Sequence, residues 1–253
     1  MRLGLGERIH AKLALKATGG RMPLSLDQGV LSVTFDDFPK SAWTEGGPVL
    51  AAHGVRGTYY VVGGFRGQVS EGQRQFDDGD LEALIEAGHE LACHTYDHTS
   101  ALKASPAEFA ASVRRNGEFV AQRFPGYRME SFAFPFGDVS LTTGKALAGF
   151  SNARGIIPAL NTSPARPMLL NAVGLESRKR AEYDIPALVE QAARGRAWLI
   201  LYTHDVGDDP SPFGCTPGEL DDVLTRAKAA GLRIAPVREV MRGQASGEGE
   251  ARV

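Results

Sequence analysis

Short apolar stretches alternate with helix-forming stretches along most of this chain, and no other feature of the sequence restricts the fold as strongly. The apolar stretches are rich in β-branched and aromatic residues and are bounded by turn-forming residues, which predicts strands. The predicted strands are Val30–Phe35, Thr58–Val62, Glu90–Cys93, Ser131–Phe134, Trp198–Thr203 and Leu232–Ile234, with a shorter one through Ala153–Ile156. Strands that are mostly apolar and separated by helices imply a parallel sheet covered by helices.

Capping residues show where several of the intervening helices begin. The segments Ser105–Glu108 and Thr216–Glu219 each read as a capping box with proline at the first helical position. Asp80 and Asp184 are each expected to cap a further helix. A (β/α) barrel and an open doubly wound sheet both fit this pattern, and in both folds the functional groups lie at the carboxyl ends of the strands.

One α/β domain accounts for residues 24–242, because no change of composition divides this range and its length suits a single barrel. Residues 1–23 form a basic, amphipathic segment that is expected either to contact an anionic membrane surface or to pack on the domain. Residues 243–253 are rich in glycine and charged residues and predict a disordered tail.

Charge and composition limit the partners that the chain is expected to have. The net charge is −2, and no basic tract interleaved with aromatic residues occurs in the body of the chain, so nucleic acid is not an expected partner. No stretch of about 18 apolar residues predicts a membrane span, and no signal peptide is recognisable. Cys93 and Cys215 lie too far apart in sequence to indicate a disulfide framework. A cytoplasmic location is therefore expected, with the inner membrane as a peripheral contact.

Four polar motifs follow predicted strands, at the point where each strand ends. They are Thr34–Asp37, His94–His98, Phe134–Asp138 and Leu201–His204. Because the carboxyl ends of parallel strands meet at one edge of a sheet, all four motifs are expected at a single cleft.

The second motif predicts a metal site. His94 and His98 are four residues apart, which places two imidazoles on one face of a helical turn, and Asp37 is the obvious third ligand. Two histidines and one carboxylate leave coordination positions open, as in catalytic sites. One divalent metal ion is expected; zinc suits these donors best, with cobalt, nickel or iron as alternatives.

The remaining polar residues complete a hydrolytic site. Asp36 is expected to face the attacking water as general base, because the side chains of neighbouring strand residues point apart. His204 is a candidate general acid, since histidine ordinarily titrates near neutral pH. The turn Pro135-Phe136-Gly137 is a candidate to bind an oxyanion through its backbone N–H groups, those of Phe136 and Gly137. Taken singly, each of these features also fits a turn or a core histidine.

The motifs TFDD, HTYDH, FPFG and LYTH, in this order across Leu31–Val240, resemble those of the polysaccharide deacetylase family. This family is also called the NodB-homology domain or carbohydrate esterase family 4. The resemblance implies a distorted (β/α) barrel, often with seven strands. It implies Asp36 as catalytic base, Asp37, His94 and His98 as metal ligands, His204 as catalytic acid, the N–H of Phe136 in the oxyanion site, and Leu201 in the pocket for the acetyl methyl group.

The chain departs from the family pattern in three places. Phe38 stands where the first motif commonly has glycine, and Ala133 stands where the third motif often has an arginine that steadies the base. A subgroup that acts on exopolysaccharides shows the same AxPxG form as this third motif. The aspartate-plus-aromatic motif that tunes the catalytic histidine is not recognisable. The candidates for its role are Asp184, Asp205, Asp208 and Asp209.

These observations predict a metal-dependent N-deacetylase that removes acetyl groups from N-acetylglucosamine units of a bacterial exopolysaccharide or its lipid-linked precursor. The long loop Asp205–Pro217 resembles that of deacetylases from exopolysaccharide clusters, including those of holdfast adhesin synthesis. Two alternatives remain open. One is a deformylase or esterase that acts on another acylated sugar, and the other is a catalytically silent glycan-binding protein.

Overall fold

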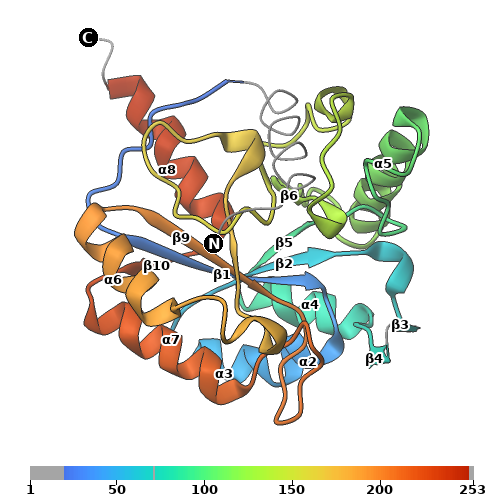
Figure 1. Cartoon of the computed structure of the whole chain (residues 1–253). Coiled ribbons are helices and arrows are strands. Elements are labelled where there is room, and N and C mark those ends of the chain that lie inside the picture. Colours follow the sequence, from blue (N-terminus) through green and yellow to red (C-terminus); the bar gives the residue numbers. More distant parts are fainter. Residues whose placement is uncertain (1–19, 71, 251–253) are drawn as a thin grey trace.

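Seven parallel strands form one curled sheet in the computed structural model, which describes residues 20–70 and 72–250 (Figure 1). Their spatial order is β7-β6-β5-β2-β1-β9-β8, and a further strand, β10, pairs with the start of β1. The strands are β1 (Val30–Asp37), β2 (Thr58–Val61), β5 (Glu90–Cys93), β6 (Ser131–Ala133), β7 (Asn152–Arg154), β8 (Val173–Gly174), β9 (Trp198–Thr203) and β10 (Arg233–Ile234). The edge strands β7 and β8 are joined through the segment 155–172, whose Leu170 N–H donates to the Ala153 carbonyl at 2.8 Å. The sheet is thus an open, distorted barrel, which confirms the expected fold class.

Every strand predicted from the sequence is present, with its ends shifted by three residues at most. β8 escaped prediction because it is only two residues long and ends in glycine. A small antiparallel hairpin, β3 (Val69–Ser70) and β4 (Gln73–Arg74), was also not predicted.

Three of the four helix caps predicted from the sequence are present. Ser105 and Thr216 form complete capping boxes, and the Asp184 carboxylate accepts from the Ala187 N–H at 2.9 Å. The cap expected at Asp80 is wrong by one turn: Asp77 caps that helix, and Asp80 returns the second hydrogen bond of the capping box. The α-helices are α2 (Lys40–Thr44), α3 (Gly46–Ala52), α4 (Asp78–Glu86), α5 (Pro106–Arg123), α6 (Ile185–Gly195), α7 (Pro217–Ala229) and α8 (Val237–Glu250). Short 3₁₀ helices are η1 (Gly63–Phe65), η2 (Pro135–Gly137), η3 (Thr143–Lys145), η4 (Pro167–Leu169) and η5 (Ser177–Lys179).

The two faces of the curled sheet differ in character. Along β1, Leu31, Val33 and Phe35 belong to the large apolar cluster that includes residues of α3, α4, α5, α6 and α7. Helices α3, α4, α6 and α7 lie together on this outer side (Figure 1). The alternate residues of β1 point into the barrel, because side chains on a strand alternate between faces. Helix α8 packs against the interior through Val240 and Met241, which cluster with Trp198 of β9.

The predicted boundary at Gly243 does not hold in the structure. Helix α8 continues through it to Glu250, and the Gln244 side chain accepts a hydrogen bond from the Ser25 N–H at 2.8 Å. Residues 1–19 and 251–253 lie outside the described residues, so the membrane contact expected of 1–23 remains a prediction. Among the helices of the described residues, none has the length and apolar character needed to cross a bilayer.

Candidate active site

The ends of β1, β5, β6 and β9 bring the four polar motifs to one edge of the barrel. Asp37 is the last residue of β1, while His94 and His98 follow β5. One carboxylate oxygen and two imidazole nitrogens of these residues all lie within 4.8 Å of one another. Asp37 Oδ1 is 3.6 Å from His94 Nε2 and 3.3 Å from His98 Nε2. The structure thus brings the three predicted metal ligands together.

His94 is held in the orientation and charge state that a metal ligand needs. Its Nδ1 lies 2.8 Å from the Ala133 carbonyl, so the proton resides on Nδ1 and the lone pair of Nε2 points toward Asp37. Burial lowers the pKa of His94 to about 4, although the neighbouring Asp36 and Asp37 act in the opposite direction. The imidazole is therefore neutral at physiological pH and available as a ligand.

The environment of Asp37 fits a bound cation. Its Oδ1 is buried and has no hydrogen-bond partner among the described residues. A buried carboxylate oxygen without a partner costs free energy unless a cation or donor contacts it. Together with two imidazole nitrogens, this oxygen makes an N/O donor set suited to zinc or a similar divalent ion.

Asp36 points into the barrel and forms an ion pair with Arg154 of β7. Both side chains are almost fully buried, and the guanidinium also lies over the rings of Tyr60 and Tyr202. Burial on its own would raise the pKa of Asp36, but Arg154 and the nearby imidazoles of His94 and His204 hold it below its usual value. Asp36 is therefore ionised, as a general base must be.

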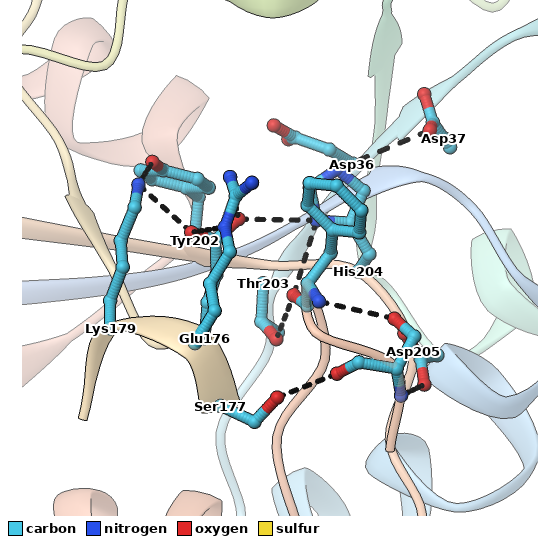
Figure 2. A network of polar contacts seen from close by, with 12 residues as sticks. Asp36, Asp37, Glu176, Ser177, Lys179, Tyr202, Thr203, His204 and Asp205 are labelled. Carbon is cyan, nitrogen blue, oxygen red and sulfur yellow. Dashed lines mark hydrogen bonds and ion pairs between the residues drawn. The ribbon is translucent and has the colours of Figure 1, made fainter.

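His204 lies between two carboxylates at the end of β9 (Figure 2). Its Nε2 is 4.0 Å from Asp37 Oδ2, on the side of the metal ligands. Its Nδ1 is 3.8 Å from Glu176 Oε1 and 3.3 Å from the Phe213 carbonyl. With Nδ1 facing these acceptors, Nε2 faces the cleft.

Glu176 is a fully buried carboxylate that the sequence analysis did not single out. Lys179 Nζ lies 2.9 Å from its Oε2 and donates to the Tyr202 hydroxyl, and Arg178 Nε lies 3.2 Å from the same Oε2 (Figure 2). These cations make it possible to bury the carboxylate beside the histidine, because a buried charge needs a partner.

The acids predicted to tune His204 do not face its ring. Asp184 caps α6, and Asp205 accepts from the Ser211 N–H at 2.8 Å, which organises the loop after β9. For Asp208 and Asp209 the structure gives no contact with His204. The acid that faces Nδ1 is Glu176, which lies in the chain segment that follows the short strand β8.

The turn Pro135–Gly137 reaches the metal ligands from β6. The Phe136 ring packs on the ring of His98, one of the predicted metal ligands, with the ring centroids 4.4 Å apart. Gly137 has a φ of 70°, and a Cβ there would lie 2.3 Å from Cγ1 of Ile156. A glycine is thus required both by backbone conformation and by the close approach of Ile156.

Leu201 lies away from the cleft, so its predicted contact with the acetyl methyl group is wrong. Its side chain is fully buried in the apolar cluster on the outer side of the sheet. The alternation along β9 instead points Tyr202 into the barrel, where its ring faces Arg154. The prediction was carried over from the family resemblance, which takes no account of the alternation of side chains along β9.

Backbone strain concentrates in the motifs of this site. Non-glycine residues with positive φ occur at Asp37 (64°), Phe38 (67°), Thr95 (62°), His98 (50°) and Phe136 (61°), and at Arg196 in the C-cap of α6. Each such residue costs roughly 1–3 kcal/mol and persists only where its surroundings hold it. The Phe38 ring is fully buried and stacks on Phe76 at 5.0 Å, which explains how a phenylalanine is held where the resemblance led us to expect glycine.

The chain is similar in sequence to proteins of known families. The sequence matches a family model described as "Polysaccharide deacetylase" over residues 25–151. It is 28% identical over 211 residues to the peptidoglycan-N-acetylglucosamine deacetylase PgdA of Listeria monocytogenes, an alignment that covers 83% of this chain and 38% of that protein. The chain therefore spans about two fifths of the length of this curated relative.

Solved structures are similar in fold. IcaB from Ammonifex degensii aligns with a TM-score of 0.50 and 24% identity, over 56% of this chain and 66% of that chain. A family 4 acetyl xylan esterase from Clostridium thermocellum, in complex with a cobalt ion, aligns with a TM-score of 0.56 and 18% identity, over 84% of this chain and 90% of that chain. At these identities the likeness concerns the fold.

Proposed function

Because the chain belongs to the polysaccharide deacetylase family, we propose that it is a metal-dependent N-deacetylase acting on N-acetylglucosamine units of a bacterial glycan. One observation supports this proposal above all others. The ligand set of Asp37, His94 and His98 shares a cleft with an ionised carboxylate, Asp36, and an imidazole, His204. The name of the Listeria relative supports N-acetylglucosamine as the acylated sugar.

The proposed reaction is hydrolysis of the acetamide bond. When bound, the cation supplies Lewis acidity that polarises the acetyl carbonyl and acidifies the attacking water. Asp36 takes a proton from this water as its oxygen bonds to the acetyl carbon. The N–H of Phe136 donates in this proposal to the oxygen that becomes negative, the role that the family pattern implies for it. His204 then gives a proton to the leaving nitrogen, so that the C–N bond breaks and acetate and the free amine result.

Two partners support these catalytic groups. Arg154 keeps Asp36 ionised and fixes its position, a role that the resemblance assigned to an arginine in place of Ala133. Glu176 faces Nδ1 of His204 and so favours the orientation in which Nε2 points at the leaving group. A catalytically silent protein was suggested by Ala133 and by the missing aspartate-plus-aromatic motif. Arg154 takes the role of the arginine absent at Ala133, and Glu176 takes that of the missing acid. This is why we favour an active enzyme.

The proposal extends to an exopolysaccharide, or its lipid-linked precursor, as the physiological glycan. The form of the third motif and the loop Asp205–Pro217 support this extension. We further propose that the enzyme is cytoplasmic and contacts the inner membrane through residues 1–23. Vesicle sedimentation of the full chain and of a chain starting at Gly20 tests this contact, which is excluded if both sediment equally with anionic vesicles.

Acetate release from chitooligosaccharides, with and without a chelator, tests the activity. We expect release that stops on chelation and returns when zinc or cobalt is added. An O-acetylated xylooligosaccharide and an N-formylated glucosamine should be assayed beside it, because the same groups can hydrolyse esters and formamides. Faster turnover of either substrate would replace the N-deacetylase by the esterase or deformylase, and no turnover of any acylated sugar would reject the enzyme.

A further inference from the structure

Two residues outside the predicted catalytic set, Lys179 of η5 and Tyr202 of β9, lie behind the base and the acid of the site. We propose that both are positioning residues for the general acid His204, and that Tyr202 also contacts the partner of the base. This inference rests on the proposed function and adds to it how the acid is held in place. It implies that both residues matter most for substrates whose leaving group must be protonated.

The Glu176 carboxylate that faces His204 is held by two cations. The half-exposed Arg178 places its Nε 3.2 Å from Oε2 and its Nη2 3.3 Å from Oε1. The mostly buried Lys179 places its Nζ 2.9 Å from Oε2. One cation is enough to balance the charge of a carboxylate, so the second contributes mainly a fixed geometry, as charge-assisted hydrogen bonds do.

Lys179 connects this carboxylate to Tyr202. Its ammonium group lies between the Glu176 carboxylate and the Tyr202 hydroxyl, to which it donates (Figure 2). Tyr202 is buried, and both burial and the charge of Glu176 raise the pKa of its hydroxyl. The hydroxyl is therefore neutral and can accept from the ammonium group. Held in this way, Glu176 keeps its Oε1 3.8 Å from Nδ1 of His204.

The ring of Tyr202 contacts cations from both halves of the site. The Arg154 guanidinium carbon lies 5.2 Å from the ring centre, and Lys179 Nζ lies 5.0 Å from it. Cations at this distance are attracted by the electrons of an aromatic ring. One buried ring thus contacts the cation that pairs with the base Asp36 and a cation that pairs with the carboxylate behind the acid.

Gly174 of β8 leaves the space that the Glu176–Lys179 pair occupies. Its φ is not positive, so the backbone conformation does not require glycine. A Cβ at this position would lie 2.9 Å from Glu176 Oε2 and 3.2 Å from Lys179 Nζ. The pair beside it therefore explains the glycine, and Gly174→Ala should displace the pair without removing either of its charges.

Two substrates with different leaving groups test the positioning role. The amine that leaves chitotetraose must be protonated, whereas 4-nitrophenolate leaves 4-nitrophenyl acetate without a proton. A residue that acts through His204 therefore affects the amide and spares the ester. We expect Lys179→Met and Tyr202→Phe each to lower kcat for chitotetraose by about tenfold or more. The KM for chitotetraose and the kcat for the ester should stay within about twofold.

Two further variants serve as controls. Tyr202→Leu removes the ring as well as the hydroxyl, so Arg154 loses its contact and both substrates should be hydrolysed more slowly. Arg180 is the cation next to Lys179 in sequence, but it pairs with Glu219 of α7. Arg180→Met should therefore leave both kcat values within about twofold.

The proposed function and the positioning role can fail separately in this design. Absence of acetate release by the wild-type chain rejects the function. Crystal structures of Lys179→Met and Gly174→Ala then still test the role, because the Glu176 carboxylate is expected to turn away from Nδ1 of His204 in both. An equal loss on the two substrates or unchanged turnover of chitotetraose in either Lys179→Met or Tyr202→Phe, or an unmoved carboxylate in the two structures, would overturn the inference.

Discussion

The outer and inner faces of the same strands have different roles: the outer face packs against helices, and the inner face carries residues of the candidate site. On the outer face, Leu31, Leu199 and Val33 join one apolar cluster with the covering helices. On the inner face, β1 places Ser32, Thr34 and Asp36 in the barrel, where each hydrogen-bonds to another side chain or to a backbone carbonyl. Parallel sheets are usually apolar on both faces, so the polar residues on the inner face of β1 are the unusual feature of this molecule.

The difference shows which substitutions the fold should tolerate. On the outer face stability comes from burial, which depends on volume and only weakly on the identity of the side chain. On the inner face the buried polar groups depend on specific partners: Asp36 depends on Arg154, and the Glu90 carboxyl group accepts from the Thr58 hydroxyl and the Arg238 N–H. Inner-face substitutions should therefore damage the site, whereas outer-face substitutions should damage only stability.

The largest effect is expected from His94→Ala at the rim of the inner face. Two remaining ligands hold a divalent ion weakly, so the variant should lose its metal and its acetate release should fall to background. Metal analysis of the purified chain together with the acetate assay checks this. Full metal content with wild-type turnover would remove His94 from the ligand set.

Arg154→Met should rank next, because it leaves the buried carboxylate of Asp36 without a partner. We expect a loss of about 3–5 kcal/mol in the free energy of unfolding, measured by urea denaturation, together with reduced turnover. The matched double variant Asp36→Asn, Arg154→Met removes the charge as well and should recover most of the stability but no activity. If the two substitutions were simply additive in stability, the pair would not be coupled as the structure indicates.

Leu199→Ala provides the outer-face counterpart. Leu199 is fully buried in the outer cluster, so its truncation should cost about 2–5 kcal/mol in unfolding free energy. The folded variant should keep its metal content and its kcat at low temperature. If the kcat of Leu199→Ala fell as strongly as that of Arg154→Met, the outer face would also support catalysis, which would contradict the division of roles between the two faces.

His89 introduces a titratable group on the outer face. Its Nδ1 accepts from the Gly57 N–H at 3.0 Å, and burial, aided by Arg56 and Arg238, lowers its pKa to about 4. The folded state thus favours the neutral ring, and protonation favours the unfolded state. The stability from this residue is complete above about pH 6.5 and is lost as the pH falls toward 4, by up to about 3 kcal/mol.

Urea denaturation between pH 7 and 4 measures this loss, with His89→Asn as the control. The asparagine can still accept from Gly57 but does not titrate, so the variant should lose less stability over the same interval. Parallel curves for the two chains would show that His89 is not the responsible group.

The sequence analysis placed Asp36 and the three candidate ligands Asp37, His94 and His98 at one cleft, where the structure also has them. It could do so because these residues lie in short motifs at the ends of strands, where local spacing determines the geometry. Arg154 could not be found in this way, since it pairs with Asp36 across 118 positions and nothing near it in sequence marks it as buried. Glu176 was missed because the strand before it is only two residues long. The role given to Leu201 was wrong because its side chain lies on the outer face of β9. The pairing of β9 with β1, which the sequence does not give, determines this face.

The central claim is that one cleft joins a cation held by Asp37, His94 and His98 with a base, Asp36, that the cation does not need for binding. The most direct measurement is the metal content and acetate release of the Asp36→Asn chain beside the wild type, on chitotetraose. We predict about one metal ion per chain in both proteins and a loss of roughly 10²–10⁴-fold in kcat for the variant. Unchanged turnover by an Asp36→Asn chain that has kept its metal would contradict the account.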